Sequence, residues 1–155
     1  TRILSLEKFI LGNRRTALEP GEMVTAIRVP KRAARGASHF LKLGARRYLV
    51  ISIAMVASRF VVGGDGTIAE AAIAVGACSA VATRLGGLEQ ALAGRPADTP
   101  LAETVEAYDF PELSPIDDVR GTGDYRRDAA RVLVARASAI ALTSAGSRVE
   151  EEVAA

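Results

Sequence analysis

Runs of apolar and β-branched residues in the first half of the chain predict β-strands. Residues 23–29 (MVTAIRV) are rich in β-branched residues and stop at Pro30, which is typical of an edge strand. Residues 40–43 (FLKL) predict a second, short strand. Residues 51–62 (ISIAMVASRFVV) are apolar on both faces. This favours a long strand covered on both sides, although a buried helix remains an alternative that periodicity alone does not exclude.

Glycines separate this long run from the next apolar run. Residues 63–66 (GGDG) supply the positive φ angles of a tight hairpin turn, so residues 67–77 (TIAEAAIAVGA) are predicted to form the return strand. The alanine content of residues 67–77 would also suit a helix, and the turn decides between the two. Together these runs predict an antiparallel sheet of three or four strands.

The second half of the chain has the spacing of amphipathic helices. Leu85, Leu88 and Leu92 recur at helical intervals. They follow Thr83, which can cap a helix, and precede Gly94, which can end one. The predicted helices cover residues 84–93, residues 101–107 after Thr99-Pro100, a first turn after Ser114-Pro115 that contains Asp117, and residues 124–145.

The helix over residues 124–145 is the longest, and its apolar stripe predicts the face that is buried. The stripe consists of Tyr125, Ala129, Val132, Leu133 and Ile140. Gly146 is predicted to end the helix. Because the strands come first and the helices after them, we predict an α+β fold, a small antiparallel sheet flanked by helices, rather than a doubly wound fold.

The chain divides into three segments by composition. Residues 1–22 are predicted to be an extended arm with a turn at Pro20-Gly21, and not a stable helix. Residues 23–146 form the α+β domain, and residues 147–155 (SRVEEEVAA) are predicted to be a frayed tail. The first residue is a threonine rather than a methionine, so we expect the chain to be a piece of a longer protein.

Length and composition narrow the function classes. The chain has 155 residues, of which 49% are hydrophobic and 25% charged, as in one globular domain. No run approaches the roughly 20 apolar residues that cross a bilayer. Cys78 is the single cysteine and His39 the single histidine, so we expect no disulfide framework and no metal site. We expect Cys78 to be buried and inert, and the protein to be reduced and cytoplasmic.

Basic residues gather between residues 28 and 47. Seven lysines and arginines occur there without an acid, in a chain of formal net charge +2 and pI about 9.0. An anionic ligand or partner would suit this stretch, but a solvated loop is the simpler interpretation. Aromatic residues make up 5% of the chain and tryptophan is absent, so base stacking has few candidates and we expect no nucleic-acid binding.

Lys42 and an aspartate pair are the remaining candidates for chemistry. Lys42 lies between two leucines of a predicted strand, so its side chain projects on the opposite face, either as a surface lysine or as a point charge for a phosphate or carboxylate. Asp117 and Asp118 are adjacent, which argues against an acid–base dyad on one helix face. We expect them to cap a helix and to pair with Arg120 or Arg126. No catalytic residue is predicted.

Four segments, in this order, resemble a known family. They are FILGNRRTALEPGEMVTAIRVP, FLKLGARRYLVISIAMVASRF, TIAEAAIAVGACSAVATRLGGLEQALAGRP and LSPIDDVRGTGDYRRDAARVLVARA. They resemble the C-terminal half of the FAD-binding (medium) subunit of molybdenum hydroxylases, the family of aerobic carbon monoxide dehydrogenase and xanthine dehydrogenase. The resemblance runs from about Leu6 to about Ala137 and implies a small antiparallel sheet flanked by helices, in agreement with the pattern above.

The resemblance also implies a function. A flavin subunit of this family holds FAD and passes electrons from iron–sulfur clusters to an acceptor, and its partners are an iron–sulfur subunit and a molybdopterin subunit. Most FAD contacts belong to an upstream domain, which residues 1–22 would continue. We therefore expect the chain by itself to hold little or no FAD and not to be catalytic.

Few cofactor contacts carry over from the family to this sequence. Met23 and Val24 match positions that lie against the cofactor, and Lys42 matches a lysine that contacts FAD. Arg46 and Arg47 match a loop that the xanthine dehydrogenase branch places near the flavin. The alternative is a non-catalytic interaction module, which docks the iron–sulfur and molybdenum subunits through its helices.

Overall fold

The computed structural model describes the backbone of residues 1–154 and the side chains of residues 1–147, and it divides into two compact units. Unit 1 is Thr1–Arg35 and unit 2 begins at Gly36. The boundary therefore lies further along the chain than residue 22, where the arm was predicted to end. Gly36 has a φ of +77°, and a Cβ atom there would collide with the carbonyl oxygen of Phe60, so the position requires glycine.

Unit 1 is a short hairpin that follows one helical turn. Its elements are α1 (Leu6–Phe9), β1 (Ile10–Gly12), β2 (Arg15–Thr16) and the 3₁₀ turn η1 (Lys31–Ala34). The guanidinium of Arg2 donates to both carboxylate oxygens of Glu22, at 2.8 and 2.6 Å. This bond lowers the pKa of Glu22 to about 2. Both side chains are in contact with solvent, so the pair adds little stability.

The predicted edge strand over residues 23–29 is wrong. The backbone of these residues has no strand pairing, and all of their side chains are exposed. A β-branched composition produces a strand only where a neighbouring strand and a buried face are present. Neither exists for this segment within unit 1.

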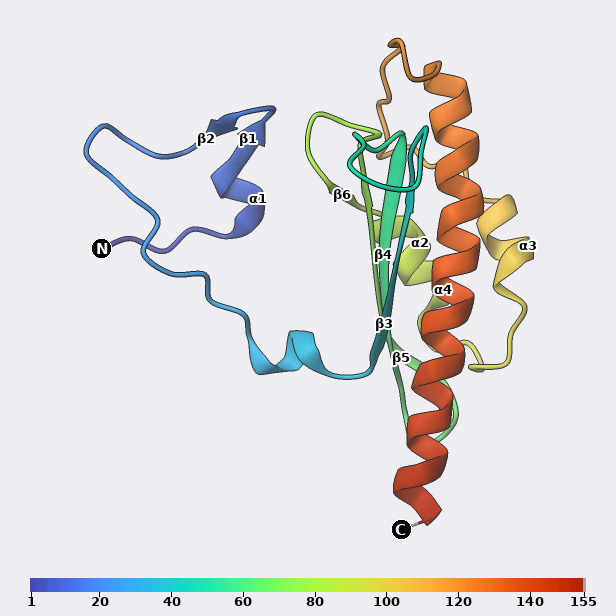
Figure 1. The fold of residues 1–155 in the computed structure, drawn as a ribbon. Coiled ribbons are helices and arrows are strands. Elements are labelled where there is room, and N and C mark those ends of the chain that lie inside the picture. Colours follow the sequence, from blue (N-terminus) through green and yellow to red (C-terminus); the bar gives the residue numbers. More distant parts are fainter. Residues whose placement is uncertain (155) are drawn as a thin grey trace. The chain divides into compact units, whose positions relative to one another are not determined.

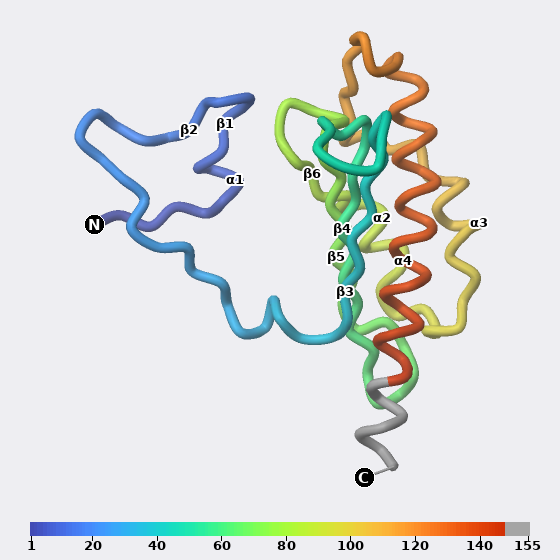
Figure 2. The backbone as a smooth tube through the Cα atoms, viewed as in Figure 1, coloured from blue at the N-terminus to red at the C-terminus, as the bar shows by residue number. Residues whose placement is uncertain are grey.

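Unit 2 is built on a four-stranded antiparallel sheet with the order β3-β4-β5-β6. The strands are β3 (Ala37–Leu43), β4 (Ala54–Val62), β5 (Ile68–Gly76) and β6 (Thr83–Arg84). Figure 2 shows β3, β4 and β5 running beside one another. The three strands predicted after residue 37, the glycine hairpin and the α+β class are thus confirmed. Gly66, in the hairpin, has the expected positive φ of +76°.

Helices cover one face of this sheet. Along β4 the buried residues alternate with half-buried or exposed ones, and the buried set is Ala54, Val56, Ser58, Phe60 and Val62. Helices α2 (Gly86–Leu92) and α4 (Gly123–Ala154) pack on this face, with α3 (Leu101–Glu106) against α4 (Figure 1). On the other face, Phe40 is 56% exposed opposite Ala57. The strand predicted over residues 51–62 is therefore covered on one side and not on both.

The shorter helices differ from prediction mainly at their starts. Helix α3 agrees with the predicted range, and Gly94 follows α2 with a φ of +77°. Helix α2 begins at Gly86 because Thr83-Arg84 pairs with β5 as the edge strand β6. The hydroxyl of Thr83 donates to the carbonyl of Val81, so it does not cap the helix. No helix follows Ser114-Pro115, and residues 114–122 form a loop.

Helix α4 is longer than predicted, and its buried face agrees with the predicted stripe only at Ala129 and Leu133, which pack against the core. It continues through Gly146 to Ala154, so the segment predicted as a frayed tail is helical over residues 147–154, and Ala155 lies outside the described residues. Tyr125, Val132 and Ile140 are 49%, 46% and 44% exposed, so the predicted stripe is wrong at these positions. The buried residues are Arg126, Ala130, Val134, Ala137, Ser138, Ala141, Leu142 and Ala145.

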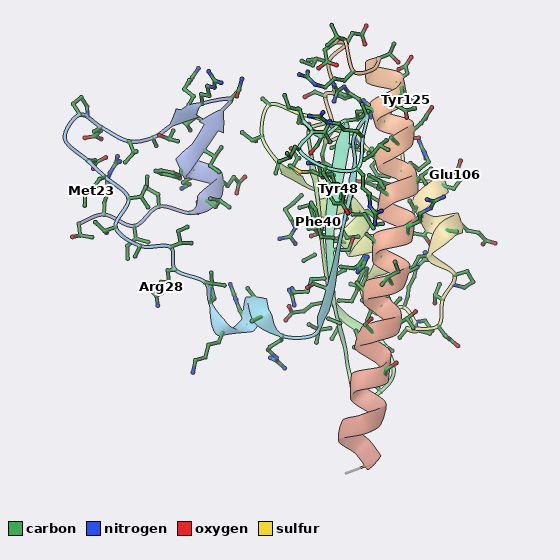
Figure 3. All side chains as sticks on the ribbon, in the orientation of Figure 1. Met23, Arg28, Phe40, Tyr48, Glu106 and Tyr125 are labelled. Atoms are coloured by element: carbon green, nitrogen blue, oxygen red, sulfur yellow. The ribbon has the colours of Figure 1, made fainter. Side chains whose placement is uncertain are left out.

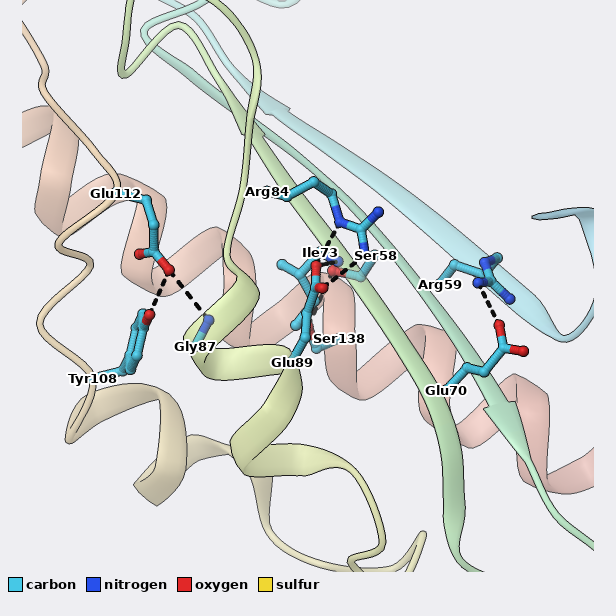
Figure 4. A network of polar contacts seen from close by, with 10 residues as sticks. All are labelled: Ser58, Arg59, Glu70, Ile73, Arg84, Gly87, Glu89, Tyr108, Glu112 and Ser138. Carbon is cyan, nitrogen blue, oxygen red and sulfur yellow. Dashed lines mark hydrogen bonds and ion pairs between the residues drawn. The ribbon is translucent and has the colours of Figure 1, made fainter. Parts of the chain in front are cut away.

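Most residues of this buried face are small, and small side chains let a helix approach a sheet closely. Polar contacts are also made across this interface: the hydroxyls of Ser58 on β4 and Ser138 on α4 lie 3.0 Å apart and are both buried (Figure 4). None of the helices within residues 1–154 combines the length and the apolar character needed to cross a bilayer.

Candidate functional site

Lys42 lies near the end of β3, on the face of the sheet that the helices leave open. Its neighbour Leu41 packs against the core, so the alternation of the strand directs Lys42 to the other face, as the sequence predicted. In the sheet it is paired with Met55. Its ammonium group donates to the carbonyl of Val50 at 2.7 Å. Lys42 is therefore held against the loop that follows its own strand.

Residues 44–52 form this loop, which connects β3 to β4. At its base, the N–H of Ile53 donates to the carbonyl of Leu43 at 2.8 Å. Within it, the guanidinium of Arg46 donates to the carbonyl of Leu49 at 2.6 Å. Leu49 has a φ of +49°, a conformation that costs energy for a branched residue. The loop is thus held in a defined shape by contacts with its own cations.

Gly44 lets the loop return close to β3, and Tyr48 packs against a cation of the loop. A Cβ atom at Gly44 would collide with Val50, so the close return of the loop requires glycine there. The guanidinium of Arg47 lies 5.3 Å from the centre of the Tyr48 ring, within the range of a cation–π contact. Tyr48, which is labelled in Figure 3, is 69% exposed.

An open hollow of about 440 Å³ lies between β3 and this loop. Lys42, Leu43, Gly44, Arg46 and Arg47 line it, so three of its five residues are cations and none is an acid. We call it the cationic hollow. Arginine presents a planar fork of donors and lysine a point charge, and both suit a phosphate or carboxylate. The arrangement is therefore chemically matched to an anionic group.

Met23 and Val24 belong to unit 1, whereas Lys42, Arg46 and Arg47 belong to unit 2. Met23, labelled in Figure 3, is 77% exposed and Val24 is 54% exposed. The structure brings Lys42, Arg46 and Arg47 together around one hollow. The sequence had singled out Lys42 by its strand position and the two arginines by family resemblance, but no pattern showed that their loop folds back onto Lys42.

The aspartate pair has the structural role that the sequence predicted. Asp117 accepts the N–H of Gly123, the first residue of α4, at 2.6 Å. Asp118 binds the guanidinium groups of both Arg120, at 2.8 Å, and Arg126, at 2.6 Å. The backbone N–H of Arg120 and, after it, the guanidinium of Arg126 lower the pKa of Asp118 to about 2. Asp118 is therefore ionised over the whole physiological range.

Cys78 is fully buried, as predicted, and burial raises the pKa of its thiol. At neutral pH it therefore remains a protonated thiol, shielded from reagents. The described residues bring together no group of three histidine, cysteine, aspartate or glutamate side chains that could hold a metal ion.

Comparisons with known proteins find the same fold. Residues 39–150 match the model of the CO dehydrogenase flavoprotein C-terminal domain family. Reconstituted CO dehydrogenase from Oligotropha carboxidovorans contains a chain that is 27% identical, with a TM-score of 0.75 over 95% of this chain and 49% of that one. CO dehydrogenase from Hydrogenophaga pseudoflava, lacking the Mo-pyranopterin moiety of the molybdenum cofactor, is 30% identical, with a TM-score of 0.75 over 92% and 47%.

A third solved structure comes from a different enzyme. Quinoline 2-oxidoreductase from Pseudomonas putida 86 contains a chain that is 25% identical, with a TM-score of 0.76 over 90% of this chain and 47% of that one. The present chain thus spans about half the length of the solved chains it resembles. No curated protein matches its sequence.

Proposed function

The chain belongs to the CO dehydrogenase flavoprotein C-terminal domain family of the molybdenum hydroxylases, and we propose that it forms one wall of the FAD site in the flavin-binding subunit of such an enzyme. Bound FAD would accept electrons from iron–sulfur clusters and pass them to an acceptor. In this proposal the partners are an iron–sulfur subunit and a molybdopterin subunit. The domain itself contributes binding and orientation, and no catalytic residue.

The cationic hollow is the observation that supports this proposal. FAD carries a negatively charged pyrophosphate and a flavin ring with polar edges, and a site for either needs donors rather than acids. Lys42, Arg46 and Arg47 supply such donors without a competing carboxylate in the lining. Lys42 is also the residue that the family resemblance assigns to FAD. Position in the strand, the lining of the hollow and family position therefore agree on the same side chain.

Met23 and Val24 are proposed to contact the apolar part of the cofactor. Both side chains are more than half exposed in unit 1, so they are free to bury apolar surface against a flexible or planar ligand. This assignment rests on the family resemblance. It predicts that replacing either residue by serine weakens FAD retention less than removal of the Lys42 charge does.

The test is FAD retention by the flavin subunit that contains this domain. Lys42→Met keeps the length of the side chain and removes its charge, while Lys42→Arg keeps the charge. Loss of a hydrogen bond to a charged group costs about 1.5–3 kcal/mol, so we expect Lys42→Met to raise the Kd for FAD roughly tenfold or more. Lys42→Arg should recover part of that loss.

Lys31→Met is the matched control, because Lys31 lies in unit 1, is exposed and lines no part of the hollow. Each variant is purified, and FAD is quantified by its fluorescence after denaturation and by titration of the apoprotein. Equal FAD affinity in the Lys42→Met and Lys31→Met subunits would overturn the proposed contact. The 155-residue chain alone is expected to release no stoichiometric FAD.

A second function, that of an interaction module, is favoured by the exposed stripe on α4. Tyr125, Val132 and Ile140 present apolar surface that the core of unit 2 does not use. We propose that a partner subunit covers this stripe. Val132→Glu with Ile140→Glu should then prevent assembly of the complex while leaving the flavin subunit folded, as judged by gel filtration and circular dichroism. Normal assembly would refute this second proposal.

A further inference from the structure

Arg126 carries a buried charge in unit 2. It lies in the first turns of α4 and is 3% exposed, and among the residues whose side chains the structure describes it is the one charged residue that is buried. A buried charge is costly unless several polar groups compensate for it. No sequence pattern distinguished Arg126 from the other arginines, beyond an expected pairing with the neighbouring aspartates.

Three segments supply acceptors to this guanidinium. Its Nη1 donates to the carbonyl of Ile53 at 2.7 Å and to the carbonyl of Ala77 at 3.2 Å. Its Nη2 donates to the Asp118 carboxylate at 2.6 Å. These acceptors come from the start of β4, the end of β5 and the loop before α4. The planar fork of arginine can serve all three at once, which a lysine cannot do.

Ile53 connects Arg126 to the cationic hollow. Its carbonyl accepts from Arg126, and its N–H donates to the carbonyl of Leu43, which lines the hollow. Ile53 therefore closes the base of the loop over residues 44–52. Lys42 is bound to the carbonyl of Val50 in the same loop. A continuous set of hydrogen bonds thus runs from Asp118 through Arg126 and Ile53 to the loop that forms the hollow.

We propose that Arg126 is a positioning residue, which Asp118 holds in place and which fixes the loop over residues 44–52 so that Arg46 and Arg47 face the hollow beside Lys42. The part of this proposal that concerns FAD rests on the proposed function above. The part that concerns the order of the loop does not. Arg126 touches no ligand in this assignment and acts through the carbonyl of Ile53.

Limited trypsin digestion of the 155-residue chain tests the order of the loop, because trypsin cleaves after Arg46 and Arg47. Arg126→Gln removes the charge and Arg126→Lys keeps it without the fork. Arg131→Gln is the matched control: Arg131 is on the same helix and donates to the carbonyls of Glu106 and Tyr108, away from the loop. Digestion is followed by mass spectrometry in native buffer, and the stability of each variant is measured by urea unfolding.

We expect cleavage after Arg46 and Arg47 to accelerate at least about tenfold in Arg126→Gln, and less in Arg126→Lys, when compared with Arg131→Gln at equal stability. Equal cleavage in Arg126→Gln and Arg131→Gln would overturn the inference. If Arg126→Gln does not fold, Arg126→Lys against Arg131→Lys makes the same comparison.

FAD affinity of the flavin subunit separates this inference from the proposed function. If the hollow binds FAD, Arg126→Lys should weaken FAD binding and change the visible circular dichroism of the bound flavin, while Arg131→Lys should do neither. Faster cleavage with unchanged FAD affinity would support the positioning role and count against the hollow as the FAD site. Unchanged cleavage would count against the positioning role whatever the FAD affinity.

Discussion

Two valines on α4 allow us to test which face of the helix is buried, because the same substitution can be made at a buried and at an exposed position. Val134 is fully buried against the sheet, whereas Val132, two residues earlier, is 46% exposed. Val132 belongs to the stripe that the sequence predicted to be buried, and Val134 does not. Val→Ala at each position removes the same atoms and gives the same change in helix propensity. The difference between the two variants therefore reports burial alone.

The magnitudes follow from the apolar surface involved. Removing two buried methyl groups at Val134 costs about 1.6 kcal/mol of transfer free energy. A cavity that does not collapse adds up to about 1 kcal/mol, and the better helix propensity of alanine returns roughly 0.5 kcal/mol. We therefore expect Val134→Ala to lower the free energy of unfolding by about 2 kcal/mol. Val132→Ala loses about half the transfer term and no cavity term, so its effect should stay within about 0.5 kcal/mol of zero.

Urea unfolding of the 155-residue chain, followed by circular dichroism, measures both variants. A change in midpoint at constant m-value reports a change in stability. Val134→Ala should lower the midpoint clearly, and Val132→Ala should leave it nearly unchanged. Equal destabilisation, or a larger effect at Val132, would mean that α4 packs on the sheet through the stripe that the sequence predicted. The proposed exposed stripe, and the interaction module that depends on it, would then be wrong.

Two further predictions concern buried polar contacts. Ser138→Ala removes the partner of the buried Ser58 hydroxyl and should lower the free energy of unfolding in urea by about 1–3 kcal/mol. The double variant with Ser58→Ala should lose less than the sum of the two single variants. Strict additivity would mean that the 3.0 Å contact contributes nothing to stability. Burial, together with the bond to Glu112, raises the pKa of Tyr108 to about 12 (Figure 4). The contribution of protonated Tyr108 to the free energy of unfolding should therefore be complete below pH 10 and be lost as the pH rises from about 10 to about 12. An ultraviolet titration in which Tyr108 ionises near pH 10 in the folded chain would contradict this.

The sheet could be predicted from the sequence because its signals are local. Residues 63–66 are four turn-forming residues between two apolar runs, a pattern that is typical of a β-hairpin. The prediction of a strand over residues 23–29 was wrong because it rested on amino-acid composition alone. Strand pairing is a contact with another segment, and nothing within residues 23–29 encodes whether a partner is present.

The buried face of α4 could not be predicted in full because three of its large apolar residues lie outside the core. Periodicity ranks residues by hydrophobicity, and this ranking placed Tyr125, Val132 and Ile140 inside. The buried face instead consists mainly of alanines and a serine, which permit a close approach, with Val134 and Leu142 among them. A stripe of small residues is a weak signal in a sequence that is rich in alanine throughout.

The candidate site, too, could be predicted from the sequence only in part. Lys42 could be found from its position between two leucines and from family resemblance. The loop over residues 44–52 could not be placed over it, because the contacts that hold the loop are made to backbone carbonyls. The bond from Lys42 to Val50 and the bond from Arg126 to Ile53 depend on the fold and not on the type of the accepting residue.

Helix α4 links the two proposed functions through different faces. Its inner face carries Arg126, which binds the base of the loop at the cationic hollow, and its outer face carries Val132 and Ile140, which the core does not need. Because the two faces have no residue in common, a charge at Val132 should abolish docking without changing FAD affinity. Conversely, Arg126→Lys should weaken FAD binding without preventing assembly. If both variants changed both properties, the faces would be coupled through α4, and docking of a partner would itself tighten the FAD site.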